Sequence, residues 1–298
     1  MISRFPTVRY LDADATRAAL SMSDAIGAME IAFGDDVETP MRSLLGPSLF
    51  MPGRVGDQTG VKVVSTVPGK PFGIVAVFDN EGACAGLVDG PTLTAIRTAA
   101  GAGLATRMLA RPDSRTLAML GAGAMAYDQV MAIREVRPIG EVLVWSRDRT
   151  NAEALAARVE GSAVSRTDEA VSVADVISTA TPARTPLFEA AAIKPGTHIN
   201  AVGAFAPDMC EIPPVVVREA IAIVDDLEAA AAEAGDLLRA GKTPDGTVAD
   251  LLAGRHRGRS GPGEITFFKS VGVAGQDVAA AAMALKKAGE LGIGSEIC

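Results

Sequence analysis

The sequence predicts an α/β protein with a mostly parallel β-sheet, and three observations support this prediction. From residue 116 onward, short apolar runs alternate with helix-compatible stretches, as in successive β–α units. One of these junctions carries the pattern Gly121-x-Gly123-x-x-Ala126 between a strand and a helix. Hydrophobic residues make up 48% of the 298 residues, which suffices for a large packed core. Consecutive β–α units make right-handed crossovers, so their strands are expected to lie parallel in one sheet.

The N-terminal part of the chain is predicted to combine helices with a β-hairpin. Ser21 and Ser23 are candidate N-caps for a second short helix within a longer helical segment. Residues 79–82, Asp-Asn-Glu-Gly, form a turn signal between two apolar runs. The polar segment 111–115 then interrupts the pattern and indicates a domain boundary. The predicted elements are helices at 15–34 and 91–109 and strands at 61–65, 73–78 and 83–88.

The remainder of the chain is predicted to alternate strands with helices. One segment, the Gly-rich basic stretch 254–263, is expected to be a solvated, mobile connection rather than a binding loop. The predicted strands lie at 116–120, 141–145, 162–164, 174–179, 198–202 and 222–224, and the predicted helices at 124–134, 149–159, 167–172, 227–236 and 274–290.

The glycine pattern after residue 120 suits the binding of a dinucleotide. Gly121 permits a tight turn, Gly123 lets the backbone approach phosphates, and the small Ala126 lets helix and strand pack closely. The free N–H groups and the positive dipole end of the helix then face the anion. An ordinary β-turn-α connection is the alternative, but the strand at 141–145 follows at the spacing of about twenty residues that a Rossmann fold uses. We therefore expect a redox cofactor and hydride transfer.

The end of the second strand predicts which dinucleotide binds. NAD-dependent enzymes usually place Asp or Glu there, on the ribose 2′-hydroxyl. Here the first residues are Ser146 and Arg147, and a guanidinium can bind a 2′-phosphate. We therefore predict NADP(H) over NAD(H). Two alternatives remain: Asp148 could turn inward, or Arg147 and Arg149 could only cap the next helix.

Composition narrows the class of partner. The net charge of −8 argues against nucleic acid, which requires a basic face. The three cysteines and two histidines form no disulfide framework or metal pattern; His198 lies in an apolar strand and is expected to be packed, and His256 lies in the basic loop. The N-terminus carries no apolar signal segment and no run of about 18 apolar residues occurs. We expect a cytoplasmic protein without a membrane partner.

Several motifs in a fixed order make the chain resemble the ornithine cyclodeaminase/μ-crystallin family over nearly its whole length. None is decisive alone, but together in this order they are specific. They are Pro40–Arg42, Gly60–Val64, Leu87–Ala100, the turn at Gly121, Ile199–Gly203 and Ile265–Gly272.

The resemblance implies a homodimer with a Rossmann domain inserted in a smaller α+β domain. Residues 1–112 plus 266–298 would form the substrate-binding and dimerisation domain, and residues 113–265 the NADP-binding domain. Members of the family cyclise ornithine to proline with loss of ammonia, reduce cyclic ketimines, or act as alanine or opine-type dehydrogenases. All of these reactions pass through an imine next to a carboxylate, so the expected partner is a small α-imino or amino acid.

The family positions assign roles to individual residues. Arg42 and Arg97 match the positions that hold the substrate carboxylate, and Lys62 matches the active-site lysine, which would bind substrate and exchange a proton. Asp89 and Asp277 also match family positions, where helix capping is an equally good role. The expected cofactor-binding residues are Thr98, Gly121, Gly123, Ala124, Met125, Ser146, Arg147, Thr179, Ala180, Thr181, Val202, Gly203 and Ser270.

One position departs from the family pattern. Phe205 stands where ornithine cyclodeaminases carry the acid–base Asp, and a phenyl ring cannot accept a proton. Asp208 is a candidate substitute, although capping of the following turn would also explain it. The sequence therefore favours the ketimine-reductase branch and reduction of Δ1-pyrroline-2-carboxylate or Δ1-piperideine-2-carboxylate. The alternatives are ornithine cyclodeamination, alanine or opine-type dehydrogenation, and a non-catalytic, NADPH-binding μ-crystallin-like protein.

Overall fold

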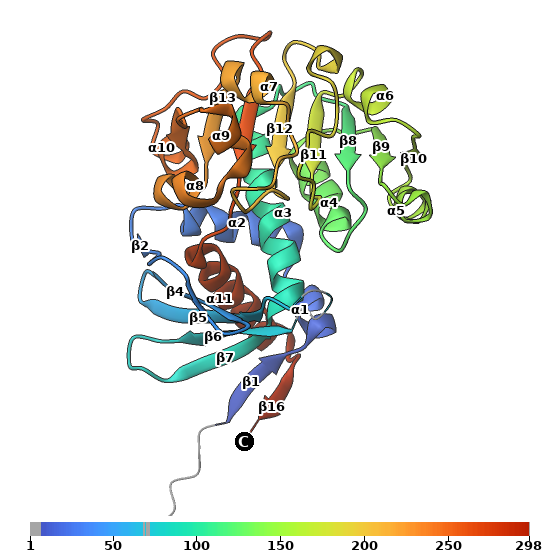
Figure 1. The fold of residues 1–298 in the computed structure, drawn as a ribbon. Helices are drawn as coiled ribbons and strands as arrows, with labels where there is room; N and C mark the ends of the chain where they lie inside the picture. Colours follow the sequence, from blue (N-terminus) through green and yellow to red (C-terminus); the bar gives the residue numbers. More distant parts are fainter. Residues whose placement is uncertain (1–6, 68, 70–71, 298) are drawn as a thin grey trace, which may run out of the picture. The chain divides into compact units, whose positions relative to one another are not determined.

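The computed structural model describes residues 7–67, 69 and 72–297. The chain divides into two compact units (Figure 1). Unit 1 comprises Met1–Arg97 and Val273–Cys298, and unit 2 comprises Thr98–Gly272. Unit 2 is thus inserted between two segments of unit 1, and helix α3 (Gly90–Leu109) runs from the first unit into the second.

Unit 1 is built on a strongly twisted sheet with the order β16-β1-β7-β6-β5-β4-β2, and β3 pairs with β4. Strand β1 is parallel to β7, and the other described pairs are antiparallel. The strands are β1 (Val8–Leu11), β2 (Val37–Glu38), β3 (Ser43–Leu45), β4 (Ser48–Val55), β5 (Gln58–Ser65), β6 (Gly73–Phe78), β7 (Cys84–Asp89) and β16 (Ser295–Ile297).

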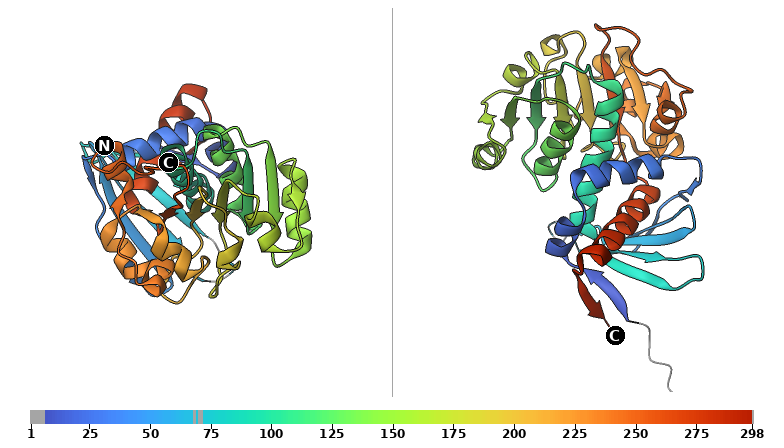
Figure 2. Two further views of the ribbon diagram at one scale, coloured as in Figure 1. Left: turned by 90° about the horizontal axis from the view of Figure 1, so that it is seen from above. Right: turned by 180° about the vertical axis from the view of Figure 1, so that it is seen from behind.

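Helix α11 (Ala274–Leu291) covers one face of this sheet, as the rear view in Figure 2 shows. Glycines on three strands let it come close: a Cβ at Gly53 would lie 3.0 Å from the Ala274 side chain, and one at Gly60 3.0 Å from Val278. A Cβ at Gly86 would collide with Leu285. The close approach buries the apolar face of α11 and positions its first turn against β4 and β5.

The N-terminal helices and the hairpin confirm the sequence prediction. The predicted helical segment is two helices, α1 (Ala13–Ala19) and α2 (Met22–Ala32). They separate at Ser21, whose hydroxyl accepts a hydrogen bond from the Asp24 amide (3.1 Å) as an N-cap. The predicted hairpin is β6 and β7, and Asp79 organises its turn by accepting hydrogen bonds from the amides of Glu81 and Ala83.

Unit 2 contains a fully parallel sheet with the order β10-β9-β8-β11-β12-β15-β13-β14. From β8 the chain proceeds to one side through β9 and β10, and then returns to the other side at β11. The strand order therefore reverses between β8 and β11, and the α/β fold class with a Rossmann unit is confirmed. The strands are β8 (Thr116–Leu120), β9 (Glu141–Trp145), β10 (Ser162–Ala163), β11 (Val176–Thr179), β12 (His198–Ala201), β13 (Ile221–Val224), β14 (Gly246–Thr247) and β15 (Thr266–Lys269).

Helices connect these strands. Two of them follow β8 and β9 directly and begin at the edge of the sheet where those strands end. The helices of unit 2 are α4 (Ala126–Val136), α5 (Arg149–Arg158), α6 (Thr167–Val171), α7 (Pro214–Glu219), α8 (Leu227–Glu233), α9 (Gly235–Ala240), α10 (Val248–Leu252) and the 3-10 helix η1 (Ala190–Ala192).

The boundaries of the units differ from the predicted 112/113 and 265/266. Strand β15 lies between β12 and β13, so residues 266–272 belong to the parallel sheet of unit 2. The second half of α3 also belongs to unit 2, where the Asn200 side chain donates a hydrogen bond to Thr106 Oγ1 (2.8 Å). The polar break at 111–115 therefore marks the end of a helix rather than the edge of a unit.

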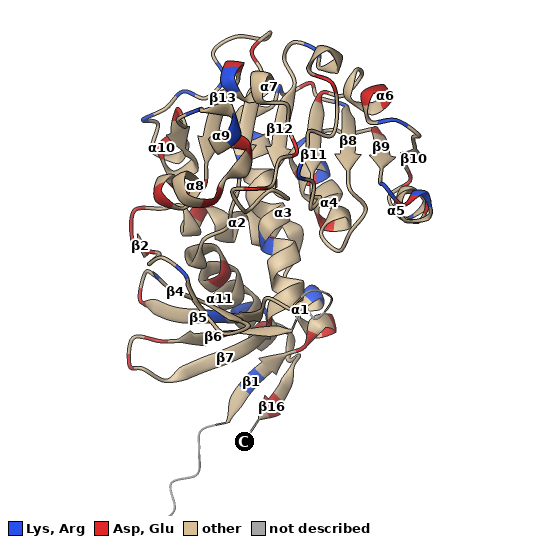
Figure 3. Cartoon of the chain, viewed as in Figure 1, with Lys and Arg blue, Asp and Glu red and all other residues tan. Residues whose placement is uncertain are grey.

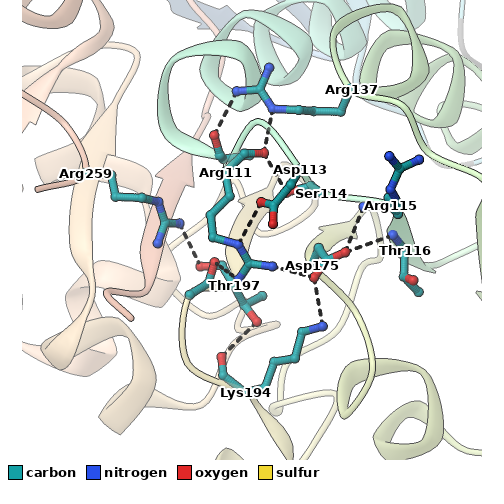
Figure 4. A network of polar contacts seen from close by, with 12 residues as sticks. Arg111, Asp113, Ser114, Arg115, Thr116, Arg137, Asp175, Lys194, Thr197 and Arg259 are labelled. Atoms are coloured by element: carbon teal, nitrogen blue, oxygen red, sulfur yellow. Dashed lines mark hydrogen bonds and ion pairs between the residues drawn. The ribbon is translucent and has the colours of Figure 1, made fainter. Parts of the chain in front are cut away.

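Arginine side chains cap the C-terminal end of α3 (Figure 4). Arg137 donates to the carbonyl oxygens of Arg107, Ala110 and Arg111 at 2.7–2.9 Å. Arg259 donates to the carbonyl oxygen of Leu109 (2.8 Å). The last carbonyls of a helix lack intrahelical donors and carry partial negative charge, so these cations stabilise them. The predicted description of 254–263 as a solvated, mobile connection is wrong at Arg259, because its half-buried guanidinium ties this loop to α3.

Asp175 joins the same network to the start of β8. Its carboxylate accepts the amides of Arg115 and Thr116 and forms ion pairs with Arg111 and Lys194, both at 2.8 Å (Figure 4). Burial alone would raise the pKa of Asp175, but the hydrogen bonds from Arg115 and Lys194 lower it to about 2. The carboxylate thereby fixes the entry of the chain into the central strand of the sheet.

Candidate functional site

Unit 2 contains a crevice of about 710 Å³ at the point where the strand order reverses. Ligands of open α/β sheets bind at this place, outside the carboxyl ends of the strands. Its walls come from the segments that follow three neighbouring strands, β8, β9 and β11. The lining residues are 121–123, 145–148, 151 and 180–187.

The glycine turn fits the phosphates of a dinucleotide. Gly121 has φ +114° and its amide donates to the Trp145 carbonyl (2.8 Å); a Cβ there would lie 2.8 Å from the Ala180 carbonyl oxygen, so only glycine suits this turn. A Cβ at Gly123 would meet no atom within 4 Å, which leaves open space beside the backbone. Helix α4 begins just beyond, and its N-cap residue Met125 makes no side-chain capping hydrogen bond. Its N-terminus is therefore suited to an anionic group.

The segment after β9 separates the alternatives that the sequence left open. Asp148 is the N-cap of α5 and accepts the Thr150 amide (2.9 Å). Arg149 is paired with Glu153 (2.7 Å) and donates to Ser165. Arg147 is exposed, lines the crevice, and its side chain forms no hydrogen bond or ion pair with the residues that the structure describes. The capping role thus belongs to Asp148, Arg149 is engaged by Glu153 and Ser165, and Arg147 is available to a ligand.

The structure brings only part of the predicted cofactor set to the crevice. Gly121, Gly123, Ser146, Arg147, Ala180 and Thr181 line it. Ala124 and Met125 lie at the start of α4, next to the lining turn. The other predicted residues, Thr98, Thr179, Val202, Gly203 and Ser270, are buried and do not line it. Among these, Ser270 donates a hydrogen bond to the buried carboxylate of Asp225 (2.8 Å).

Unit 1 contains a buried cluster of charged side chains around Asp277. Lys62 on β5 places its Nζ 2.8 Å from Asp277 Oδ2, and Arg97 on α3 places its Nε 2.9 Å from Asp277 Oδ1. Arg97 also donates to Gln276 Oε1 (3.2 Å). Exposure is 3% for Lys62, 5% for Arg97 and 0% for Asp277. Figure 3 shows basic residues on β5 and α3 and an acidic residue on α11.

The charges in this cluster tune one another. Burial lowers the pKa of Lys62 to about 8, and the positive charges of Arg97 and Arg42 act in the same direction while Asp277 opposes them. Burial alone would raise the pKa of Asp277, but Arg97 and Lys62 hold it below its ordinary value. The cluster therefore contains a carboxylate that stays ionised and an ammonium that can release its proton near neutral pH.

The three predicted substrate-binding residues, Arg42, Lys62 and Arg97, all lie in unit 1. The two aspartates that match family positions, Asp89 and Asp277, have different roles. Asp89 is a helix cap, since its carboxylate accepts the Thr92 amide (2.8 Å) in the first turn of α3. The capping alternative is wrong for Asp277, which pairs with Lys62 and Arg97 instead. Arg42 is half-buried and near enough to Lys62 for its charge to lower that pKa.

The remaining acid–base candidates are occupied or buried. Asp208 forms an ion pair with Arg184, and both side chains are more than half exposed. Phe205 is 54% exposed on the segment after β12. His198 is fully buried between Thr266 and Asn200, and burial lowers its pKa to about 3, which confirms it as a packed, neutral residue. Within residues 7–67, 69 and 72–297, no group of His, Cys, Asp and Glu has the arrangement of a metal site, and no helix is both long and apolar enough to cross a bilayer.

Sequence reasoning missed Glu211, Asp236, Lys269 and Gln276, all fully buried. In the sequence, Glu211 lies between the apolar residues Cys210 and Ile212, and Lys269 directly follows Phe267 and Phe268. A charged residue within an apolar run is expected to be buried, and a buried charge is almost always paired, so these positions could have been read as members of buried ion pairs. The partners themselves lie far away in the sequence and carry no local signature.

Comparisons with known proteins agree with the sequence motifs. The family model of the ornithine cyclodeaminase/mu-crystallin family matches residues 36–290. The ketimine reductase mu-crystallin of Mus musculus is 37% identical over 219 residues, which cover 73% of this chain and 69% of that protein. The structure of Thermococcus litoralis Δ1-pyrroline-2-carboxylate reductase, in complex with NADH and L-proline, matches with a TM-score of 0.92 at 31% identity and covers 97% of this chain and 100% of that chain.

A further solved structure is an archaeal alanine dehydrogenase dimer with bound NAD. It matches with a TM-score of 0.91 at 29% identity and covers 98% of this chain and 99% of that chain. The matched segment of the family model includes the glycine turn, Arg42, Lys62, Arg97 and Asp277, and both solved structures match nearly the whole chain. The resemblance seen in the motifs is confirmed: the chain belongs to the ornithine cyclodeaminase/mu-crystallin family.

Proposed function

We propose that the protein is an NAD(P)H-dependent oxidoreductase that reduces a small cyclic α-imino acid, Δ1-pyrroline-2-carboxylate or Δ1-piperideine-2-carboxylate, to the L-amino acid. One observation carries the proposal: the buried Lys62, with a pKa of about 8, is surrounded by two arginines and one carboxylate. Two guanidinium groups suit a substrate carboxylate, and an ammonium of this pKa suits the protonation of a neighbouring nitrogen. The named activities of the Mus musculus and Thermococcus litoralis relatives support the same substrate class.

In this proposal, residues of unit 1 bind the substrate and supply the proton, and the crevice of unit 2 holds the cofactor. Arg42 and Arg97 hold the substrate carboxylate, and Asp277 with Gln276 fixes the orientation of the Arg97 guanidinium. Lys62 holds a proton at Nζ and gives it to the ring nitrogen, while Asp277 keeps the ammonium in place. The walls of the crevice and the N-terminus of α4 hold the dinucleotide, which supplies the hydride for the imine carbon when bound. Proton and hydride together convert the C=N bond to an amine, and no ammonia leaves.

We also propose a preference for NADP(H), carried by Arg147. Its exposed side chain lines the crevice just after β9, where a Rossmann fold usually carries the residue that binds the ribose, and the nearby Asp148 is engaged as a helix cap. The test compares KM for NADPH and NADH in the wild type and in Arg147→Ala, with Arg149→Ala as the matched control. We expect KM for NADPH to rise at least about tenfold in Arg147→Ala while KM for NADH stays the same. A wild type that favours NADH would refute the preference.

We further propose a homodimer. Unit 1 exposes apolar side chains at one end of its sheet: Leu44 and Leu45 on β3 are 66% and 73% exposed, and Phe72 and Ile74 at β6 are 74% and 41% exposed. The strand register places them at the same end of the sheet. Leu44 pairs with Leu49 on β4, Leu49 pairs with Val64 on β5, and Val64 pairs with Gly73 at the start of β6. Such patches usually mark protein–protein contacts, and the archaeal alanine dehydrogenase is a dimer.

The function is tested by product analysis. Purified protein is supplied with Δ1-pyrroline-2-carboxylate or Δ1-piperideine-2-carboxylate, and oxidation of NAD(P)H is compared with the amount of L-proline or L-pipecolate formed. A parallel assay measures ammonia from L-ornithine. We expect one amino acid per NAD(P)H oxidised and no ammonia, because Phe205 cannot act as a base. Ammonia from ornithine would establish a cyclodeaminase instead, and tight NADPH binding without any turnover would establish a binding protein.

A further inference from the structure

A fully buried carboxylate, Glu211, connects the segments that follow β11 and β12. Its Oε1 accepts hydrogen bonds from the amide (2.7 Å) and the hydroxyl (2.8 Å) of Thr181. Its Oε2 accepts the amides of Gly203 (2.9 Å) and Ala204 (3.1 Å). We call Glu211 and these four donors the Glu211 clamp. Four donors on one carboxylate saturate it and fix the spacing of the two segments to within hydrogen-bond tolerance.

The segment after β11 is the wall of the dinucleotide crevice. Residues 180–187 line it, and Thr181 is the second residue after the end of β11. Glu211 holds both ends of this wall, since its backbone carbonyl also accepts the Leu187 amide (2.9 Å). Glu211 itself does not line the crevice. It can therefore influence a bound dinucleotide only through the residues that it positions.

Glu211 lies beside a second buried carboxylate and a buried ammonium. Asp236 accepts the amides of Glu211 (2.7 Å) and Ile212 (3.0 Å) and forms an ion pair with Lys269 (3.1 Å). Asp236 and Lys269 are fully buried. Burial raises the pKa of Glu211, and the ammonium of Lys269 acts against this. A buried ion pair costs desolvation energy and can often be replaced by apolar residues, so the presence of Asp236 and Lys269 beside Glu211 calls for a role.

The fit around Gly203 leaves little freedom. A Cβ at this position would collide with the Thr181 backbone and with the Glu211 carboxylate. The segments after β11 and β12 thus touch at backbone distance, and the carboxylate fills the remaining space between them. Movement of the wall at Thr181 must break the Glu211 clamp first.

We propose that Glu211 is a positioning residue that sets the crevice wall at Thr181–Leu187 in the form that binds the dinucleotide. The inference rests on the proposed function only in that the crevice binds NAD(P)H. It predicts that loss of the clamp weakens cofactor binding while the imino acid still binds normally. Lys62, Arg42 and Arg97 belong to unit 1 and do not depend on the clamp.

The test uses the isosteric substitution Glu211→Gln in the full-length protein. The glutamine amide replaces one of the two acceptor oxygens by an NH₂ group, which is a donor. Either Thr181 or the amides of Gly203 and Ala204 then face a donor and lose their hydrogen bonds. We expect the Kd for NADPH, measured by fluorescence titration without substrate, to rise at least about tenfold, the equivalent of one or two lost hydrogen bonds. KM for NADPH should rise in parallel, while KM for the imino acid and kcat at saturating cofactor stay within about twofold.

The matched control is Glu264→Gln. Glu264 also accepts two backbone amides, from Ser260 (2.6 Å) and Gly261 (2.8 Å), but it does not line the crevice or contact its wall. Its Kd for NADPH should be unchanged. If Glu211→Gln does not fold, Glu211→Asp keeps the charge on a side chain one methylene shorter and gives the same test.

Two results would overturn the proposal. An unchanged Kd for NADPH in a folded Glu211 variant would show that the clamp does not set the wall. A lower kcat with unchanged Kd and KM would indicate a purely structural role, because partial unfolding removes active molecules without altering the affinity of the rest. Failure of the proposed imine reduction would leave the Kd measurement valid, so the two hypotheses fail separately.

Discussion

At the scale of single residues, the proton transfer proposed for unit 1 depends on the loss of water around Lys62. Lys62 is 3% exposed, so its ammonium has lost most of its hydration. It gains one attractive partner, the Asp277 carboxylate, and is repelled by the positive charges of Arg97 and Arg42. Desolvation disfavours its charged form, and Asp277 restores only part of that cost. The result is an ammonium with a pKa of about 8, which suits the proton transfer proposed for it near neutral pH.

This pKa predicts the pH dependence of the reaction. Because the pKa of Lys62 is lowered, its proton is present below about pH 8 and lost above it. We expect kcat/KM for imine reduction to fall as the pH rises through this value. In Lys62→Arg, whose guanidinium stays protonated, the high-pH decline should disappear together with most of the activity. A wild-type profile that stays flat through about pH 8 would remove Lys62 from the proton transfer.

Substitution of the two crevice glycines by alanine should affect different properties, cofactor binding at Gly123 and stability at Gly121. At Gly123 a Cβ meets only open space, so Gly123→Ala should fold normally but weaken NADPH binding at least about tenfold, because the methyl group occupies the place of the phosphates. At Gly121 the positive φ and the Ala180 carbonyl make Gly121→Ala lower the free energy of unfolding by about 2 kcal/mol. Gly140→Ala, also in open space, is the control. Unchanged NADPH affinity in Gly123→Ala would contradict the assignment.

At the scale of elements, periodicity predicted the β–α units of unit 2 well, because each buried strand reads as an apolar run with a turn after it. It failed where a strand lacks such a run. Strand β4 contains Pro52 and Gly53, which weaken any strand signal in the sequence. Strand β15 was seen as a motif but not as a strand, since pairing with β12 and β13 is a long-range property.

The cap of α3 gives a prediction at the same scale. Arg137 supplies donors to three carbonyls at the end of this helix. Arg137→Met keeps the aliphatic stem but leaves these carbonyls without those donors, so the free energy of unfolding should fall by about 2–3 kcal/mol. Arg149→Met, which breaks an exposed i,i+4 pair, should cost about 0.5 kcal/mol or less. Urea unfolding measures both, and equal effects would contradict the capping role.

At the scale of the whole molecule, two signals in separate parts of the sequence predicted two sites. The glycine turn predicted the crevice of unit 2, and family positions predicted Arg42, Lys62 and Arg97 in unit 1. What escaped prediction is how buried charges pair. Arg97 and Asp277 are 180 positions apart, and Glu211 reaches Thr181 across 30 positions, so neither pair leaves a local pattern. The sequence therefore pointed to the glycine turn and to the charged residues of unit 1, but it did not show which buried groups pair with one another.

The exposed apolar end of unit 1 predicts the state of assembly. Aspartate at both Leu44 and Leu45 would place charges in the proposed dimer contact, and sedimentation should change from dimer to monomer. Leu238→Asp on α9, an exposed leucine of unit 2, is the control and should leave the dimer intact. A wild type that sediments as a monomer at micromolar concentration would refute the dimer.

The measurement that tests the central claim most directly is the rate of NADPH oxidation with Δ1-pyrroline-2-carboxylate in Lys62→Met and wild type, with the Kd for NADPH determined for both. Methionine keeps the length of the side chain but has no proton to give. We predict that kcat/KM falls by about 10²-fold or more while the Kd for NADPH is unchanged, because the lysine belongs to unit 1 and the crevice to unit 2. Equal kcat/KM in the two proteins would contradict the account.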